Sequence, residues 1–335
     1  MPEIDLKQSI RGFMEVYLIN TGVRFDIFSV LSGKKLSIDQ LVDKLKIPKK
    51  FIKIWCNTAY CFGVIERIGD KIYLKKNLEK LLADKDSTFY LGDFIRIMAS
   101  YLGPDMEKQH EYIKKKKKLP FYEHDREFIE LVVNRGRQRG NLYLTKIIPQ
   151  LKDVEHKLNQ GCDFLDLGCG GGSFLIALAQ KYKKTKFTGV EIDDTSIKIA
   201  QKLMRKEALR NLSFFCTNGK NIDYQNEFDL ITMNLVLHEI DPKHRKQIVK
   251  NAYKALKSNG KLVILEFPYP EKREDFSDPR FAMGIYDQFY EMIWGTKHIT
   301  WTEQKEILES CSFLNIKRKF IDSAYVLITA EKNIS

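Results

Sequence analysis

The segment Phe164-Leu-Asp-Leu-Gly-Cys-Gly-Gly-Gly-Ser-Phe174 decides how the second half of this 335-residue chain folds. A short apolar run containing Asp166 leads into glycines at 168, 170, 171 and 172, and the following run 174–180 is apolar and favours a helix. Glycine has no Cβ and accepts positive φ, so a turn of this composition lets the backbone approach a ligand closely. We therefore expect a buried strand, a tight turn and a helix that begins at the turn.

Strand and helix patterns alternate from this segment towards the end of the chain. We expect strands at 162–167, 186–191, 212–216, 228–234, 260–266, 316–320 and 324–330, and helices at 173–182, 194–209, 242–256 and 302–311. This alternation predicts an α/β fold with a mostly parallel seven-stranded sheet. Only residues 321–323 join the last two strands. So short a link forms a hairpin but no parallel crossover, and one strand near the sheet edge should therefore be antiparallel.

The N-terminal half has a different pattern. Residues 1–31 carry apolar side chains at helical spacing, which need a cover from the rest of the protein or from a second subunit. Ser37 is a suitable N-cap for a short helix ending at Leu45, and a second helix should follow Pro48. Two short strands about Gly69-Asp70 complete the order helix, turn, helix, hairpin, which is typical of a winged helix.

The domain organisation follows from these two patterns. We expect an N-terminal all-helical and winged-helix domain over 1–125, and the α/β domain over 126–335. Residues 103–125 are polar and lysine-rich with two prolines, which favours a loop or hinge. The winged helix is either a DNA-reading module or a packing and dimerisation module, since its second helix mixes lysines with large aromatic side chains.

Composition limits the classes of function. The net charge of +12 permits binding to nucleic acid, but lysine is spread along the chain, and the one dense run, Lys114–Lys118, is typical of a solvated linker. The six cysteines show no CxxC pair and no ligand spacing, so we expect reduced thiols and no metal site. We find no apolar run near the ~20 residues of a membrane span and no secretory signal pattern, so we expect a cytoplasmic protein.

Two acidic residues narrow the ligand of the glycine turn. The dinucleotide pattern G-x-G-x-x-G fails, because Ser173 occupies its last position. Asp166 lies two residues before the first glycine, where a carboxylate can face the ammonium group of a ligand. Glu191 ends the next strand, where an acid can accept both hydroxyls of a ribose. A nucleoside with a cationic end suits this arrangement.

Ordered motifs in the second half resemble those of class I S-adenosylmethionine-dependent methyltransferases. They are Phe164–Gly172, Gly189-Val-Glu-Ile-Asp193 and Phe228-Asp-Leu-Ile231. Together with the winged-helix pattern, Leu235-Val-Leu-His-Glu-Ile-Asp241 and the strand ending at Glu266, the chain is similar to small-molecule O-methyltransferases of the plant caffeate, hydroxyindole and bacterial polyketide type. The resemblance implies a Rossmann-like methyltransferase domain, S-adenosylmethionine as cofactor, and a small-molecule acceptor with an aromatic or phenolic hydroxyl. It also implies a homodimer formed through an N-terminal domain that does not read DNA.

The resemblance assigns a set of cofactor-binding residues. These are Asp166, Gly168, Gly170, Gly172, Glu191, Asn218 and Asn234. The aspartate and the glycines would line the methionine and ribose part of the cofactor, and Glu191 would hold the ribose hydroxyls. Asn218 stands where the family usually has an aspartate facing the adenine amino group. An amide oxygen can still accept that hydrogen bond, or Asn218-Gly219 is simply a turn.

His238 is the candidate catalytic residue. It falls where these O-methyltransferases carry their general base, and Glu266 matches a position that orients the histidine. A hydroxyl is a poor nucleophile until its proton leaves, and histidine titrates near working pH. A purely structural histidine is the alternative. The family's further acidic partner is replaced here by Lys297-His298-Ile299-Thr300. The aromatic insertion 267–301 is either core or a lid over a planar acceptor.

Other functions stay open from the sequence. One is a methyltransferase that acts on RNA or protein, which the net charge of +12 motivates. Methyl transfer to a carbon or nitrogen of a small molecule is a variant of the main hypothesis. A third hypothesis is a winged-helix regulator that senses the cofactor and presents a basic, exposed second helix.

Overall fold

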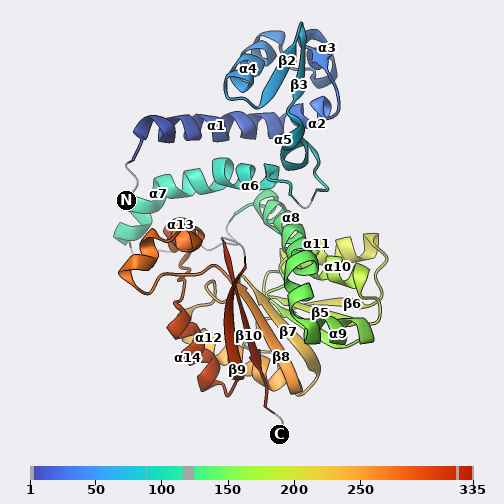
Figure 1. Ribbon diagram of the computed structural model, residues 1–335, viewed down its shortest axis with the longest axis vertical. Helices are drawn as coiled ribbons and strands as arrows, with labels where there is room; N and C mark the ends of the chain where they lie inside the picture. Colours follow the sequence, from blue (N-terminus) through green and yellow to red (C-terminus); the bar gives the residue numbers. More distant parts are fainter. Residues whose placement is uncertain (1–3, 88, 116–123, 322–323, 334–335) are drawn as a thin grey trace. The chain divides into compact units, whose positions relative to one another are not determined.

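The computed structural model describes residues 4–87, 89–115, 124–321 and 324–333 (Figure 1). The chain divides into two compact units, Met1–Glu107 and Lys108–Ser335. The division falls inside helix α7 (Gly103–Lys115), earlier in the chain than the boundary between residues 125 and 126 that the sequence pattern suggested.

The expectation of a loop over 103–125 is wrong for its first half, which forms α7. Pro104 lies in a helical segment that continues from α6 (Gly92–Ile97) through the π turn η2 (Met98–Leu102), and the lysine, glutamate and glutamine residues that follow favour a helix. The lysine run therefore begins in this helix, and its residues 116–118 lie outside the described residues. The next helix, α8 (Arg126–Leu142), is capped by Asp125, whose carboxylate accepts a hydrogen bond from the Phe128 N–H at 2.9 Å.

The first unit contains the predicted order of helix, turn, helix and hairpin. Its helices are α1 (Leu6–Arg24), α2 (Ile27–Leu31), α3 (Ile38–Leu45), α4 (Lys49–Cys61), α5 (Lys76–Leu78), η1 (Glu79–Ala83), α6 (Gly92–Ile97) and η2 (Met98–Leu102). Strands β1 (Leu36–Ser37), β2 (Ile65–Ile68) and β3 (Lys71–Leu74) pair in the order β1-β3-β2. Ser37 caps α3 in a reciprocal pair with Gln40, as its sequence position predicts. Phe28, Ile52 and Trp55 form the centre of this unit's core.

The second unit is built on the predicted seven-stranded sheet, in the order β6-β5-β4-β7-β8-β10-β9. The strands are β4 (Asp163–Leu167), β5 (Lys186–Glu191), β6 (Leu212–Cys216), β7 (Phe228–Asn234), β8 (Leu256–Glu266), β9 (Leu314–Ile321) and β10 (Tyr325–Glu331). Neighbours from β6 to β8 pair parallel, and β10 pairs antiparallel with both β8 and β9. The prediction of one antiparallel strand beside the edge is confirmed.

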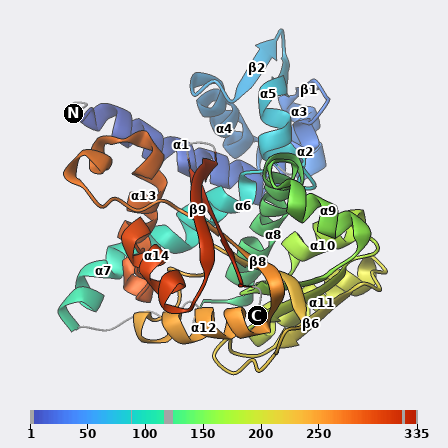
Figure 2. The same ribbon diagram turned by 60° about the horizontal axis from the view of Figure 1, so that its bottom comes forward.

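Helices cover both faces of this sheet because successive side chains of a strand point to opposite sides. Phe164 and Leu230 belong to one apolar cluster, and the next residues, Leu165 and Ile231, belong to the other. Helices α9 (Lys152–Gln160), α10 (Ser173–Lys181) and α11 (Asp194–Lys206) lie on the first side, and α12 (Pro242–Ala255) and α14 (Trp301–Ser310) on the second (Figures 1 and 2). Shorter helical turns complete the unit: η4 (Tyr143–Ile147), η5 (Ile148–Gln150), η6 (Arg273–Ser277), η7 (Pro279–Phe281) and η8 (Met292–Trp294).

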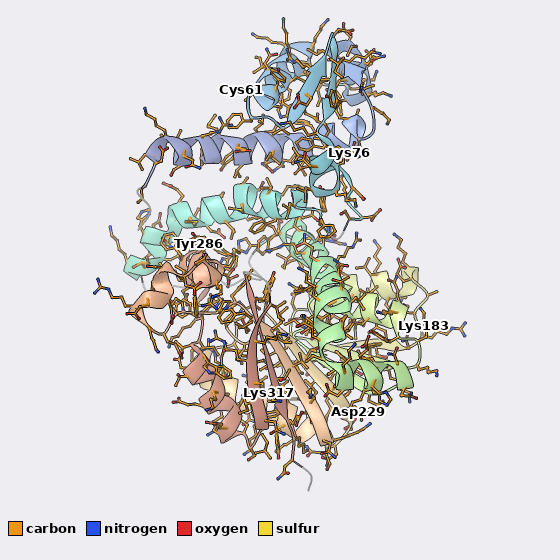
Figure 3. The ribbon with its side chains drawn as sticks, viewed as in Figure 1. Cys61, Lys76, Lys183, Asp229, Tyr286 and Lys317 are labelled. Atoms are coloured by element: carbon orange, nitrogen blue, oxygen red, sulfur yellow. The ribbon has the colours of Figure 1, made fainter. Side chains whose placement is uncertain are left out.

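The aromatic insertion after β8 folds around helix α13 (Ala282–Glu291). The large apolar side chains of the insertion are divided in the structure: Ile293 is buried, whereas Tyr286, labelled in Figure 3, is 62% exposed. The buried positions of the helix include Asp287. A polar side chain of α13 therefore turns towards the interior of the unit.

Helices α8 and α10 approach each other closely at two glycines of α8. A Cβ built on Gly140 would lie 2.7 Å from the Cβ of Ala177, and one built on Gly136 would lie 3.1 Å from the Cβ of Ser173. Ser173 also donates a hydrogen bond to the Val133 carbonyl at 3.2 Å. This contact presses α8 against the start of α10, next to the glycine turn.

Replacing Gly140 by Ala should destabilise the second unit by about 1–3 kcal/mol, because the added methyl overpacks a closed helix contact. The matched control is Gly12→Ala in α1, where an added Cβ meets nothing within 4 Å. There the change should stabilise by up to about 1 kcal/mol through helix propensity alone. Urea unfolding monitored by circular dichroism measures both. An unchanged midpoint in Gly140→Ala would contradict the close contact.

Candidate active site

The glycine turn is held against the end of β5 by Glu191. One carboxylate oxygen accepts the Gly170 N–H at 3.0 Å, and the other accepts the N–H groups of Ile192 at 2.7 Å and Asp193 at 3.1 Å. Gly168 has φ +78°, and a Cβ there would lie 2.4 Å from a methyl of Val236. Glycine is therefore required at 168 both for its left-handed backbone and for the approach of the segment after β7.

Asp166 is placed by the parallel pairing of β4 with β7, in which it stands opposite Thr232. Its carboxylate accepts hydrogen bonds from the Thr232 hydroxyl at 2.6 Å and the Asn234 amide at 2.9 Å. The Asn234 oxygen in turn accepts a hydrogen bond from the Tyr143 hydroxyl at 2.5 Å. Burial raises the pKa of Asp166 to about 7, although these hydrogen bonds and the Arg139 guanidinium oppose the rise.

Asn218 follows β6 and closes a local turn. Its side-chain oxygen accepts the Lys220 N–H at 2.9 Å, and its carbonyl accepts the Asn221 N–H at 2.8 Å. The amide is therefore occupied by its own backbone, which is the turn that the sequence also allowed. Asn218 shares the carboxyl edge of the sheet with the other predicted residues through its position after β6.

His238 and Glu266 come together at the carboxyl ends of β7 and β8. Nδ1 of His238 lies 2.6 Å from one oxygen of Glu266, and the other oxygen accepts the Leu237 N–H at 2.8 Å. Both side chains are buried. Burial alone would lower the pKa of His238, but the carboxylates of Glu266 and Glu291 outweigh it and raise the pKa to about 10.

Three further residues surround His238, and only His298 was considered from the sequence. The His298 ring stacks on His238 with centroids 4.3 Å apart, and its Nε2 lies 2.8 Å from Oδ2 of Asp287. Nε2 of His238 lies 3.8 Å from the same Asp287 oxygen and 3.7 Å from Oε2 of Glu291. Burial and Asp287 raise the pKa of Glu291 well above its usual range. Asp287 and Glu291 are four residues apart on α13, a spacing that puts them on one helical face and was the available signal.

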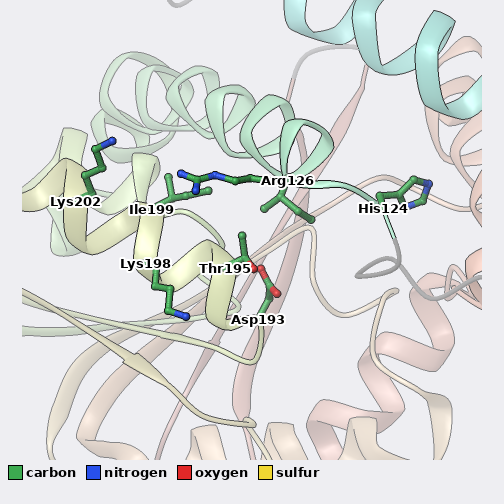
Figure 4. Close-up of a pocket in the computed structure, with 8 residues that line it drawn as sticks. His124, Arg126, Asp193, Thr195, Lys198, Ile199 and Lys202 are labelled. Carbon is green, nitrogen blue, oxygen red and sulfur yellow. The ribbon is translucent and has the colours of Figure 1, made fainter.

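A separate pocket of about 420 Å³ lies between the start of α8 and helix α11 (Figure 4). Its lining comes from the start of α8 and from α11: His124, Arg126, Ile129, Asp193, Thr195, Lys198, Ile199 and Lys202. Asp193 follows Glu191 by two residues, so this pocket adjoins the acid that the sequence assigned to a ribose. It is not the place where His238 and Glu266 meet.

Comparison with known proteins agrees with this arrangement. Residues 164–260 match the model of a methyltransferase domain. A tRNA (guanine-N(7)-)-methyltransferase of Pediococcus pentosaceus is 26% identical over 140 residues, which are 40% of this chain and 66% of that protein. The S-adenosyl-L-methionine-dependent methyl transferase PigF of Serratia sp. is 22% identical over 83% of this chain and 81% of its own length. The solved human N-acetylserotonin methyltransferase, in complex with S-adenosylmethionine, has a TM-score of 0.77 at 15% identity and covers 99% of this chain and 100% of its own.

Residues 164–260 therefore match a methyltransferase domain, in the part of the chain where the motifs around the glycine turn predicted one. Over its whole length the chain shares the fold of O-methyltransferases, with 22% identity to PigF over most of that length. S-adenosylmethionine is the cofactor of this domain. Within the part of the chain that is described, no helix is long and apolar enough to cross a membrane.

The raised pKa of Asp166 predicts that cofactor affinity depends on pH. With its pKa raised to about 7, the folded chain keeps the proton of this carboxyl between about pH 4 and 7, where the unfolded chain has lost it, so the carboxyl contributes less to folding as pH rises through that window. A ligand ammonium favours the ionised form. We expect the affinity for S-adenosylhomocysteine to rise about tenfold from pH 6 to pH 8.

Isothermal titration calorimetry at pH 6, 7 and 8 measures this trend. In Asp166→Asn the dependence on pH should disappear and binding should be weak at every pH, because the amide carries no charge. If the variant and the native chain follow the same curve, Asp166 does not face the ammonium group.

Proposed function

We propose that this protein transfers the methyl group of S-adenosylmethionine to a hydroxyl of a small aromatic or phenolic molecule. The observation that carries the proposal is the buried His238–Glu266 pair at the carboxyl ends of β7 and β8, of which β7 pairs with the strand that leads into the glycine turn. The contact of Val236 with Gly168 links the cofactor turn to the segment that holds His238. Phe267, Tyr269 and His298 stack or tilt around the pair, which suits a planar acceptor.

In the proposed reaction, the acceptor oxygen attacks the methyl carbon as the bond from that carbon to the sulfonium sulfur breaks. The products are a methyl ether and a neutral thioether, S-adenosylhomocysteine. The hydroxyl proton passes to Nε2 of His238, while Glu266 holds Nδ1 and fixes the ring. Because the neighbouring carboxylates raise the pKa of His238, the imidazole must release a proton before it can act as a base. The protein's remaining task is to align oxygen, methyl and sulfur.

Replacing His238 by Ala should lower kcat by about 10²–10⁴-fold, the usual effect of removing a general acid–base group. Binding of S-adenosylhomocysteine should be retained, since none of the contacts of Asp166, Gly170 and Glu191 described above involves this imidazole. Methylation of a panel of phenols and hydroxylated heteroaromatics, read by mass spectrometry, gives the rates. His156→Ala on exposed α9 is the control and should match the native rate. Unchanged turnover in His238→Ala would make the histidine structural.

We also propose that the first unit forms a homodimer through α1. This helix exposes apolar side chains at positions 6, 10, 13, 14 and 17, which form one stripe along it. Phe13 is 60% exposed. A stripe of this kind on the surface of a protein needs a partner, and a second copy of the same helix supplies a matching apolar face. The resemblance to dimeric O-methyltransferases supports the same partner.

Phe13→Lys should convert the dimer to a monomer, because it places a charge in the centre of the apolar stripe. Gln8→Lys, an exposed position on the opposite side of α1, is the matched control and should remain dimeric. Size-exclusion chromatography with light scattering gives the mass directly. A native chain that is monomeric at micromolar concentration would remove this part of the proposal.

A further inference from the structure

We propose that His238, Asp287, Glu291 and His298 form a binding site for a divalent first-row transition-metal ion. Binding of the ion is independent of the proposed function, and only its part in catalysis depends on methyl transfer. The sequence predicted no metal site, because the four residues come from three separate segments: the end of β7, helix α13 and the loop before α14. The fold brings them together inside the second unit.

The spacing of the four ligand atoms fits one ion. One nitrogen or oxygen from each residue lies within 4.8 Å of the other three. Nε2 of His298 and Oδ2 of Asp287 are 2.8 Å apart, and Nε2 of His238 lies 3.7 Å from Oε2 of Glu291. Around an ion with bonds of about 2.1 Å, adjacent ligand atoms are about 3.0–3.4 Å apart and opposite ones about 4.2 Å. Small side-chain shifts therefore bring all four atoms to bonding distance.

His238, which has a role in both proposals, is already oriented as a metal ligand. Glu266 holds Nδ1 of His238 at 2.6 Å and is itself fixed by the Leu237 N–H. This carboxylate–histidine arrangement fixes the ring and leaves Nε2 for a metal. His298 is held between two rings, with His238 at 4.3 Å and Tyr269 at 5.7 Å between centroids. Both imidazoles thus present nitrogen atoms to Asp287 from rigid positions.

One carboxyl oxygen of the cluster lacks a hydrogen-bond donor among the described residues. Glu266 and Asp287 are buried, and Oε2 of Glu291 is buried and accepts no hydrogen bond from the described residues. A buried carboxylate oxygen without a hydrogen-bond donor is costly. A dication bound by Asp287 and Glu291 would supply the missing partner. Two imidazoles with two carboxylates are the ligand set of Zn²⁺, Fe²⁺, Mn²⁺ or Co²⁺ rather than of an alkali-metal ion.

A bound ion would change the part that His238 plays. Its Nε2 would be a ligand and could not accept the proton of the acceptor. An acceptor hydroxyl that binds the ion has its pKa lowered, as metal-bound water does, and releases its proton to solvent as the oxygen–metal bond forms. The base role and the ligand role of His238 therefore exclude each other, and one experiment separates them.

The experiment uses the full-length protein, stripped with EDTA and freed of the chelator. Calorimetric titration with Zn²⁺ and Mn²⁺, and the visible spectrum on adding Co²⁺, should show one ion per chain. His298→Ala and Glu291→Gln should weaken binding at least about 100-fold, and Glu266→Gln about 10–100-fold, as expected for a residue that orients a ligand. His156→Ala, which removes an exposed histidine, should bind as the native chain does.

Folding and function are controlled separately. Glu291→Gln keeps the size of the side chain, and circular dichroism with S-adenosylhomocysteine binding confirms that each variant is folded. Failure of the native chain to bind one ion, or equal binding by His298→Ala, would overturn the proposal. The metal titrations contain no cofactor and no acceptor. Their result therefore remains valid even if the protein proves not to transfer methyl groups. If the metal-free enzyme were fully active, the metal ion would have no part in catalysis, and the role of His238 as general base would be retained.

Discussion

The pairing of β4 with β7 is the constraint on which the site depends. It sets Asp166 opposite Thr232, and the same register carries Asn234 to the Asp166 carboxylate. Two residues beyond Asn234, Val236 lies against Gly168, which only glycine allows at this distance. The chain then reaches His238 with the ends of β4 and β7 already fixed. A shift of this register by one residue would turn Asp166 to the other face of the sheet and separate the cofactor turn from the histidine.

Much of this half of the fold could be predicted, because its signals are local. Strands β5, β6 and β7 have the predicted bounds, since each is a short apolar run between clear breaks. The loop expected over 103–125 was wrong for its first half, because lysine and proline were taken as breakers, whereas Pro104 lies in a helix that continues from the π turn η2. The roles of Asp166 and Glu191 were inferred from their distance to the glycines along the chain, and the structure places both against the turn or the strand beside it.

The acceptor side could not be predicted in the same way. Asp287 and Glu291 lie in an insertion that is rich in aromatic residues, for which the sequence predicted a core or a lid. The local sequence does not indicate which face of α13 turns inward. That orientation comes from tertiary packing, which buries Asp287 and leaves Tyr286 at the surface. His298 was noted only as the residue found where an acid was expected. Its place in the site depends on the stacking of its ring on His238, and this contact cannot be inferred from the spacing of the two residues along the chain.

The two ends of the site thus differ in electrostatic character. At the cofactor end, Asp166 and Glu191 each accept two or more hydrogen bonds from neighbouring groups, which partly offset the rise in pKa that burial causes. At the other end, Glu266 is satisfied by Leu237 and His238, but Glu291 leaves one buried oxygen without a donor. A protein interior tolerates such an imbalance when the missing charge arrives with a ligand. The proposed metal ion would supply a partner for that oxygen.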